Sequence, residues 1–182
     1  MMKRIEKIVR QLLIELGENP DREGLADTPA RIAEMYKEIF SGYRMNVGLG
    51  VCFSEETNTI AVKDIQFYSM CEHHMLPFYG KILIVYISSG MLVDISKLVC
   101  LVEKYAHRLQ IQERLTKQIA DELIGMGIKG VSIIVEAEHL CMKMRGVRSD
   151  SSIMTVCHRG IMEQKDFREH VLSMTHVPKP KL

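Results

Sequence analysis

The stretch KILIVYISSG, residues 81–90, places six consecutive apolar residues before a Ser-Ser-Gly turn sequence. β-branched and aromatic residues favour an extended chain, and the Ser-Ser-Gly sequence favours a turn, so we expect a strand over residues 81–87. A similar composition predicts a strand over residues 59–68. Further along, an extended stretch is also expected where Val131, Ile133, Val135 and Ala137 alternate with Ser132, Glu136 and Glu138. Another extended stretch is expected over 153–162.

Helices are predicted around these strands by apolar residues that recur every three or four positions. One such face covers residues 3–16 and is followed by Gly17, and another begins at Thr28-Pro29 and continues to Phe40. We expect Thr28 to cap its helix, because Pro is favoured at the first helical position. After the second strand, Ser96 is expected to cap a helix over residues 97–108. The remaining predicted helices pass through Leu115, Ile119 and Leu123, and over residues 166–173.

The order of elements is therefore two helices, two strands, two helices and two strands. This order predicts an α+β fold with helices on one face of an antiparallel sheet. Residues 42–58 lose the helical periodicity and carry Gly48 and Gly50, which indicates a loop. We accordingly expect an N-terminal helical extension and linker over residues 1–58 and one folded domain over residues 59–182.

The composition excludes several classes of protein. The 182 residues carry 24 Lys and Arg against 23 Asp and Glu, so a broad nucleic-acid-binding face is not expected. The longest apolar run in the central region, Ile82–Ile87, is far shorter than the roughly 20 residues that span a membrane. The N-terminus lacks the apolar block of a secretory signal, and the five cysteines are odd in number. We expect a cytoplasmic protein whose cysteines are thiols or metal ligands.

A metal-binding pattern lies between the first two predicted strands. Cys71 and His74 have the Cys-x-x-His spacing that allows a thiolate and an imidazole to bind one ion, and His139-Leu140-Cys141 offers a further ligand. Three ligands and an open position are typical of a catalytic zinc site. In an extended chain residues i and i+2 point to the same side, so His139 would share the cavity of Cys141 and could carry protons there. From spacing alone, buried structural cysteines remain an equal alternative.

Charged residues outside this pattern have two interpretations. Gln112-Glu113 fits a solvated helix face or a charge pair with Arg114 or Lys117, or else a functional buried carboxylate. Four basic residues are either ordinary surface charge or a site for an anion near the metal. They are Lys97, Lys143, Arg145 and Arg148.

Four separated blocks of this sequence resemble the signature blocks of the GTP cyclohydrolase I family. They occur in the family's order, the resemblance runs from about residue 19 to residue 172, and it is densest over 65–147. The blocks are Cys71–Lys81, Ser96-Lys97, Gln110–Thr116, and His139–Met142 with Arg145-Gly146-Val147.

The resemblance implies a zinc enzyme that opens the imidazole ring of GTP, releases C8 as formate and forms 7,8-dihydroneopterin triphosphate. It implies that zinc is held by Cys71, His74 and Cys141, and that its bound water, with a lowered pKa, attacks C8. His139 and His73 would move protons near neutral pH, with His139 assigned to N7 of the purine.

The same resemblance implies the substrate contacts. Glu113 would accept hydrogen bonds from the guanine N1–H and 2-amino group, which also excludes adenine, and Gln112 would help through its side chain or backbone. The ribose and triphosphate would be held by Ser96, Lys97 and Arg145.

The fold implied by the resemblance is the tunnelling fold, in which sheets from several subunits close a barrel. The family assembly is a homodecamer of two stacked pentameric rings with active sites between subunits. Two rival functions are a nitrile reductase of 7-deazaguanine metabolism, which has this fold and uses a cysteine nucleophile and NADPH, and an inactive zinc-stabilised assembly protein. The set of Cys71, His74 and Cys141 favours zinc hydrolysis over both.

Two residues depart from the family pattern. Cys100 stands where the family has an arginine that contacts the triphosphate, and Asp94 stands where it has glycine. Loss of a guanidinium and gain of a carboxylate are expected to weaken phosphate binding. In the alternative interpretation Cys100 packs in the apolar face of its helix, while Arg148 or Lys143 contacts the phosphates.

Overall fold

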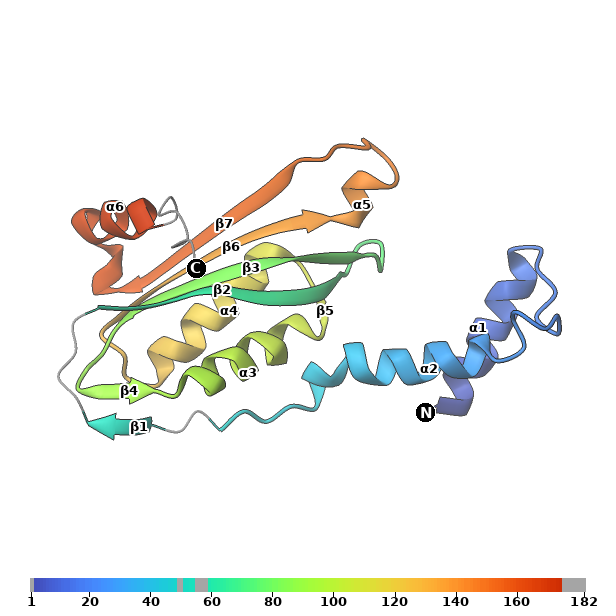
Figure 1. Cartoon of the computed structure of the whole chain (residues 1–182), viewed down its shortest axis with the longest axis horizontal. Helices are drawn as coiled ribbons and strands as arrows, with labels where there is room; N and C mark the ends of the chain where they lie inside the picture. The colour runs from blue at the N-terminus through green and yellow to red at the C-terminus, as the bar shows by residue number, and fades with distance from the viewer. Residues whose placement is uncertain (1, 49–50, 55–58, 175–182) are drawn as a thin grey trace, which may run out of the picture.

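A computed structural model describes residues 2–48, 51–54 and 59–174, and its centre is a five-stranded sheet with the strand order β5-β2-β3-β6-β7 (Figure 1). The strands are β2 (Thr59–Cys71), β3 (Pro77–Ile87), β5 (Leu109–Gln110), β6 (Gly130–His139) and β7 (Ser152–Gly160). Neighbouring strands are antiparallel except β5, which runs parallel to the end of β2. The sheet is therefore mixed, and the prediction of a purely antiparallel sheet is wrong because two-residue β5 carries no strand pattern of its own.

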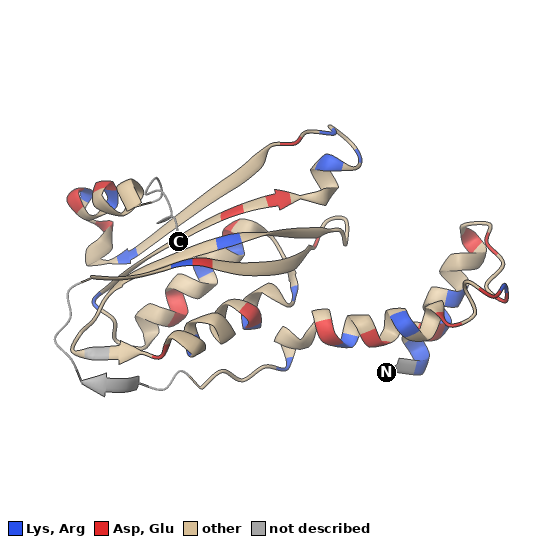
Figure 2. Cartoon of the chain, in the orientation of Figure 1, with Lys and Arg blue, Asp and Glu red and all other residues tan. Residues whose placement is uncertain are grey.

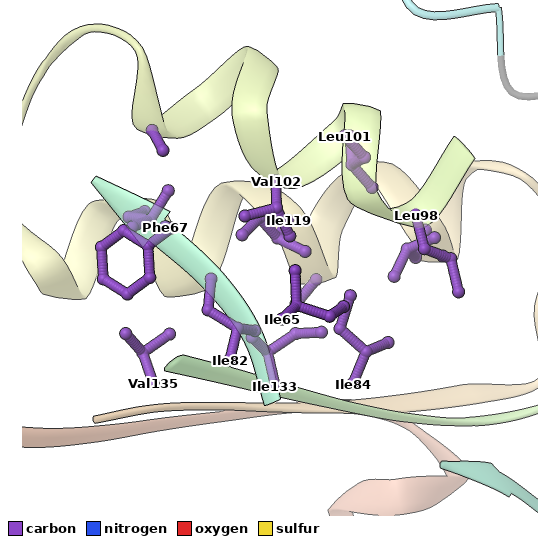
Figure 3. Close-up of a cluster of buried hydrophobic side chains, with 14 of the residues drawn as sticks. Ile65, Phe67, Ile82, Ile84, Leu98, Leu101, Val102, Ile119, Ile133 and Val135 are labelled. Atoms are coloured by element: carbon purple, nitrogen blue, oxygen red, sulfur yellow. The ribbon is translucent and has the colours of Figure 1, made fainter. Parts of the chain in front are cut away.

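Helices α3 (Ile95–Ala106) and α4 (Gln112–Gly125) cover one face of this sheet. The apolar residues of β2, β3 and β6 that alternate toward these helices form the core with them (Figure 3), including Ile65, Ile82, Ile133, Leu101 and Ile119. The fold is thus α+β, as predicted.

The opposite face of the sheet is covered at one end by η2 (Ile161–Glu163) and α6 (Lys165–Ser173). Val85 and Ile134 alternate with core residues on their strands, so they face away from α3 and α4 and pack with Met162 and Val171. Helices therefore lie on both faces, and the expectation of one covered face holds only for α3 and α4. The predicted strand over 153–162 ends at Gly160 because η2 begins there.

The N-terminal extension is a pair of helices, α1 (Met2–Glu15) and α2 (Thr28–Ile39), followed by η1 (Ser41–Tyr43). Figure 1 shows α1 reaching away from the sheet. The extension meets the rest of the chain where the Gly42 N–H donates to the His107 carbonyl (3.1 Å) and the Arg108 guanidinium donates to the Gly42 carbonyl (2.7 Å). The N-terminal extension is therefore attached at the C-terminal end of α3.

The predicted linker over residues 42–58 contains more structure than its sequence indicates. Within it, β1 (Val51–Ser54) pairs antiparallel with β4 (Met91–Val93) to form a second, two-stranded sheet. The four residues of β1 show no alternating pattern that would predict a strand. The strand forms by pairing with β4, which lies forty residues further along the chain. The expected boundary near residue 58 lies outside the described residues.

Both predicted helix caps shift toward the N-terminus. The N-cap of α2 is Asp27 instead of Thr28, with Pro29 in the first turn. The N-cap of α3 is Asp94, whose carboxylate accepts the backbone N–H of Ser96 at 2.8 Å. A helix can begin at any capping residue near its apolar face, so local sequence places the start only to within one or two positions.

Charged residues of both signs are interspersed along α1, α2 and α6 (Figure 2), in agreement with the near-neutral composition. Within the described part of the chain, no helix combines the length and apolar character needed to cross a membrane.

Candidate metal and substrate site

Three potential metal ligands converge where β2 and β6 end. Cys71 is the last residue of β2, and a tight turn, closed by the Met75 N–H donating to the Cys71 carbonyl (2.8 Å), returns His74 toward it. Cys141 lies in the single turn of α5 (Leu140–Lys143) that follows β6. The ligand atoms of Cys71, His74 and Cys141 all lie within 4.8 Å of one another.

The chemistry of this group fits a metal ion. The Cys71 and Cys141 sulfur atoms are 4.0 Å apart, close to the roughly 3.8 Å that two bonds of about 2.3 Å impose at tetrahedral zinc. Burial, and then the neighbouring Cys71 sulfur, raise the pKa of the Cys141 thiol, and a bound cation would favour the thiolate form of this residue. Cys71 is buried whereas His74 is exposed, which leaves one side of the group open to a further ligand.

His139 lies beside this group, as predicted, but the backbone between His139 and Cys141 is not the extended chain on which the prediction was based. β6 ends at His139 and α5 starts at the next residue, so the premise of an extended chain from His139 to Cys141 is wrong. The His139 ring instead lies in register with Phe78 on β3 and stacks on it, with ring centroids 4.7 Å apart and planes at 5°. Burial lowers the pKa of His139, and the charge of Glu113 partly opposes this shift.

Two further predicted residues are exposed at the metal group. His73 follows Cys71 in the turn, with its Nδ1 atom 3.9 Å from the Cys71 sulfur. Arg145, in the loop after α5, has a guanidinium nitrogen 2.8 Å from Nε2 of His74. Both are therefore within reach of a molecule bound at the open side.

Gln112 and Glu113 occupy the first turn of α4 and face different surroundings. The Gln112 side chain is 1% exposed and bonds to His139 at 2.8 Å, which leaves its backbone for any contact with a base. Glu113 is exposed and lines a groove of about 260 Å³ with Thr116, Thr155 and Cys157.

Glu113 is exposed, so the expectation of a buried carboxylate is wrong within one chain, and the expected pairing with Arg114 or Lys117 is not supported either. Arg114 pairs with Glu72, and Lys117 pairs with Asp121, so both cations considered for that role have other partners. In the ranges that the structure describes, no ion pair includes Glu113. Its carboxylate is available to a ligand.

The ion pair between Glu72 and Arg114 joins the metal-binding turn to the start of α4. The two terminal guanidinium nitrogens of Arg114 donate to the Glu72 carboxylate, one of them at 3.0 Å, and this pairing lowers the pKa of Glu72. Sequence reasoning missed this role, although Glu72 stands inside the ligand motif. The position of Glu72 between Cys71 and His73 could have suggested a role at the metal group. Its partner Arg114 is 42 residues away, so no local sequence pattern predicts the ion pair.

Ser96 and Lys97 are not brought to this group within one chain. They occupy the first turn of α3 next to β4, whereas the other end of α3 meets β2, where the Ser69 hydroxyl donates to the Ala106 carbonyl at 2.6 Å. Ten residues of helix separate Ser96 from Ala106, a length of about 15 Å. The predicted site residues therefore form two separate groups in this chain.

The cations proposed to replace the missing arginine differ in availability. Lys143 pairs with Glu138 at 2.8 Å and lies 3.6 Å from Asp150, so its charge is already balanced. Arg148 is exposed, with a positive φ of 52° in the loop that also holds Gly146. Arg148 is thus the freer of the two.

An α+β chain that gathers two thiols and an imidazole beside a buried histidine defines a candidate metal-dependent enzyme. A family model described as GTP cyclohydrolase I matches residues 5–176. The chain belongs to the GTP cyclohydrolase I family.

Individual relatives agree with this family. A GTP cyclohydrolase 1 from Clostridium kluyveri is 50% identical over 177 residues, covering 94% of this chain and 96% of the relative. A GTP cyclohydrolase 1 from Desulforamulus reducens is 50% identical over 171 residues, or 91% of each chain. One from Hyperthermus butylicus is 47% identical over 162 residues, covering 88% and 83%.

A solved structure shares the fold of part of this chain. The crystal structure of the archaeosine synthase QueF-Like in the apo form matches with a TM-score of 0.50 and 15% sequence identity. The match covers 58% of this chain and 97% of the other. At this identity the likeness shows the fold alone.

Proposed function

We propose that this protein is a GTP cyclohydrolase I, which opens the imidazole ring of GTP by hydrolysis, releases C8 as formate and forms 7,8-dihydroneopterin triphosphate. Family membership over nearly the whole chain supports the reaction and the substrate. The observation that carries the proposal is the convergence of Cys71, His74 and Cys141 beside His139. The cytoplasmic location remains a prediction.

Zinc is the proposed metal, because two thiolates and one imidazole suit this ion and three protein ligands are typical of its catalytic sites. When bound, zinc supplies a water-derived nucleophile near neutral pH. The chain holds the ion through Cys71, His74 and Cys141. The turn that carries His74 is fixed by the Glu72–Arg114 pair, so the protein sets the ligand geometry before substrate arrives.

The proton transfers are assigned to His139 and His73. His139 is held on Phe78 and is proposed to act at N7 of the purine, while His73, exposed next to Cys71, is the second proton carrier. The unpaired carboxylate of Glu113 is proposed to accept the N1–H and 2-amino group of guanine. Gln112 would contribute to the base site through its backbone only.

The triphosphate site is proposed to be shared between subunits. Arg145 lies at the metal group, whereas Ser96 and Lys97 lie about 15 Å along α3 from the end that meets β2, so a neighbouring copy would supply them. This arrangement supports the tunnelling-fold homodecamer, in which strands at the edges of one subunit's sheet pair with those of its neighbours.

Co-expression of two inactive variants tests the shared site. Lys97→Ala and Cys141→Ala are each expected to abolish turnover, and mixed oligomers are expected to recover part of it, because some sites receive both intact groups. Mixed oligomers of Cys71→Ala and Cys141→Ala are the control and should stay inactive, since both positions lie in the same subunit. Equal inactivity of the two mixtures would contradict a shared site.

The reaction itself is tested with GTP. Purified, zinc-loaded protein is expected to convert GTP to a fluorescent pterin after oxidation of the product, and to leave ATP unchanged. NADPH oxidation with a 7-deazaguanine nitrile would instead identify the reductase. Lack of turnover of GTP by metal-loaded oligomer would favour the assembly protein.

A further inference from the structure

The Gln112 side chain is buried in a network that fixes which way its amide points. Its Nε2 atom lies 3.0 Å from the Val135 carbonyl, 2.9 Å from the Ile153 carbonyl and 3.2 Å from the Thr155 hydroxyl. Carbonyl oxygens only accept hydrogen bonds, so the amide must present its two N–H groups to β6 and β7. The Oε1 atom is thereby directed to the opposite side.

That oxygen faces His139, with 2.8 Å between Gln112 Oε1 and His139 Nε2. An amide oxygen accepts and never donates, so His139 Nε2 must carry the hydrogen. In the neutral ring the other nitrogen, Nδ1, then has a free lone pair. Across the described ranges, Gln112 is the only hydrogen-bond partner of this ring.

The threonines beside Gln112 hold its backbone and amide in place. The Thr116 hydroxyl donates to the Gln112 carbonyl at 2.7 Å, so the 2.6 Å contact between the Thr116 and Thr155 hydroxyls must be a donation from Thr155. With the Phe78 ring fixing the plane of His139, neither partner of the Gln112–His139 bond is free to rotate.

We propose that Gln112 is a positioning residue that locks His139 in the Nε2–H form, so that Nδ1 is the atom that exchanges a proton with the purine. This role rests on the proposed function for the identity of the substrate. Of the two contacts with guanine expected for Gln112, it leaves only the backbone one, because both ends of the side-chain amide already have protein partners.

Solid-state ¹⁵N NMR of histidine-labelled, zinc-loaded protein at pH 8 measures the tautomer directly, and the signals of His139 are assigned by their loss in His139→Gln. Wild-type protein is expected to show a protonated Nε2 and an unprotonated Nδ1. Gln112→Met removes the oxygen acceptor and should allow the Nδ1–H form to appear. A protonated Nδ1 in the wild-type neutral ring would overturn the proposal without any variant.

Two matched controls separate tautomer control from general loss of packing. Thr155→Val removes one neighbour of the Gln112 amide but leaves Oε1 in place, so the tautomer should not change. Gln110→Met makes the same substitution at another glutamine that is 1% exposed and whose Nε2 donates to the Tyr105 carbonyl. If the tautomer of His139 changed as much in Gln110→Met as in Gln112→Met, the effect would be a general consequence of altered packing, and the proposal would be contradicted.

Kinetics give the second readout. Gln112→Met is expected to lower kcat about 10- to 100-fold, the usual effect of losing a residue that orients a functional histidine, with the Kd for GTP changed less than about twofold. A large rise in Kd would show that Gln112 reads the base. If the wild-type tautomer is as predicted but GTP is not turned over, the proposed function fails while the role of Gln112 in orienting His139 stands.

Discussion

The sulfur atoms of Cys71 and Cys141 lie 4.0 Å apart although 70 residues separate them along the chain. Cys71 is the last residue of β2 and Cys141 is the second residue of α5, which follows β6. Strand β3 lies between β2 and β6 in the sheet, so these strands bring the thiols together. Burial and the proximity of Cys71 raise the pKa of Cys141, so a bound cation would stabilise the thiolate form of this residue.

Replacement of Cys71, His74 or Cys141 by Ala is expected to abolish zinc retention and turnover, because two remaining ligands hold the ion too weakly. Metal content after dialysis checks this. Cys157→Ala, at a half-buried free cysteine outside the group, is the control and should retain zinc. Full zinc occupancy in Cys141→Ala would remove that residue from the ligand set.

Glu113→Gln is expected to weaken GTP binding by about 1.5–3 kcal/mol, the range of a hydrogen bond to a charged group. The substitution keeps the shape of the side chain but replaces an anionic acceptor with an amide that also donates. Isothermal titration measures the loss. Glu103→Gln, on the exposed side of α3, provides the control. Unchanged affinity in Glu113→Gln would return Glu113 to the solvated helix face.

The Glu72–Arg114 pair predicts a pH-dependent contribution to stability. Because Arg114 lowers the pKa of Glu72, the pair stabilises the fold above the ordinary glutamate pKa of about 4.3, and the contribution is lost as the pH falls through the lowered value. Arg114→Gln should therefore lower the melting temperature at pH 7 but not at pH 2. The effect is small because both side chains are partly exposed.

The same variant should also release zinc faster, since the turn that carries His74 loses its attachment to α4. Lys117→Gln breaks the pair with Asp121 on the same helix and serves as the control. Equal zinc release from Arg114→Gln and Lys117→Gln would show that the Glu72–Arg114 pair does not support the metal group.

Cys100→Arg is expected to lower the apparent KM for GTP, with a smaller effect on kcat. Cys100 lies one turn after Lys97 on α3, so an arginine there adds a forked cation on the face expected to meet the triphosphate. The gain should shrink as salt rises. Val99→Arg adds the same charge on another side of the helix and should help less. No gain at low salt would identify Cys100 as a packing residue.

The long elements were predictable because their sequences repeat the geometry of their structures. Strand β6 alternates apolar and polar residues except at Ile134, and α1 repeats apolar residues every three or four positions, so each element shows its period locally. Strands β4 and β5 have three and two residues and exist only because β1 and β2 lie alongside them. No local pattern encodes such pairing.

The candidate site was predictable to the extent that short motifs or family blocks carry it. Cys71 and His74 share one turn, so their spacing was informative, whereas the route from His139 to Cys141 depended on a helix turn that only the structure reveals. The roles of Gln112 and Glu72 depend on partners 27 and 42 residues away. Lys97 is separated from the metal group because α3 runs away from that group toward its own N-terminus. The spacing of residues within a helix does not predict how the helix is oriented on the sheet.

The release of formate from GTP labelled with ¹⁴C at C8 tests the central claim most directly, when measured against the zinc content of the same preparation. We predict one labelled formate for each pterin formed, at a rate proportional to bound zinc, and restored when zinc is returned to stripped protein. Pterin formation without labelled formate, or formate release at an unchanged rate from fully zinc-free protein, would contradict the account.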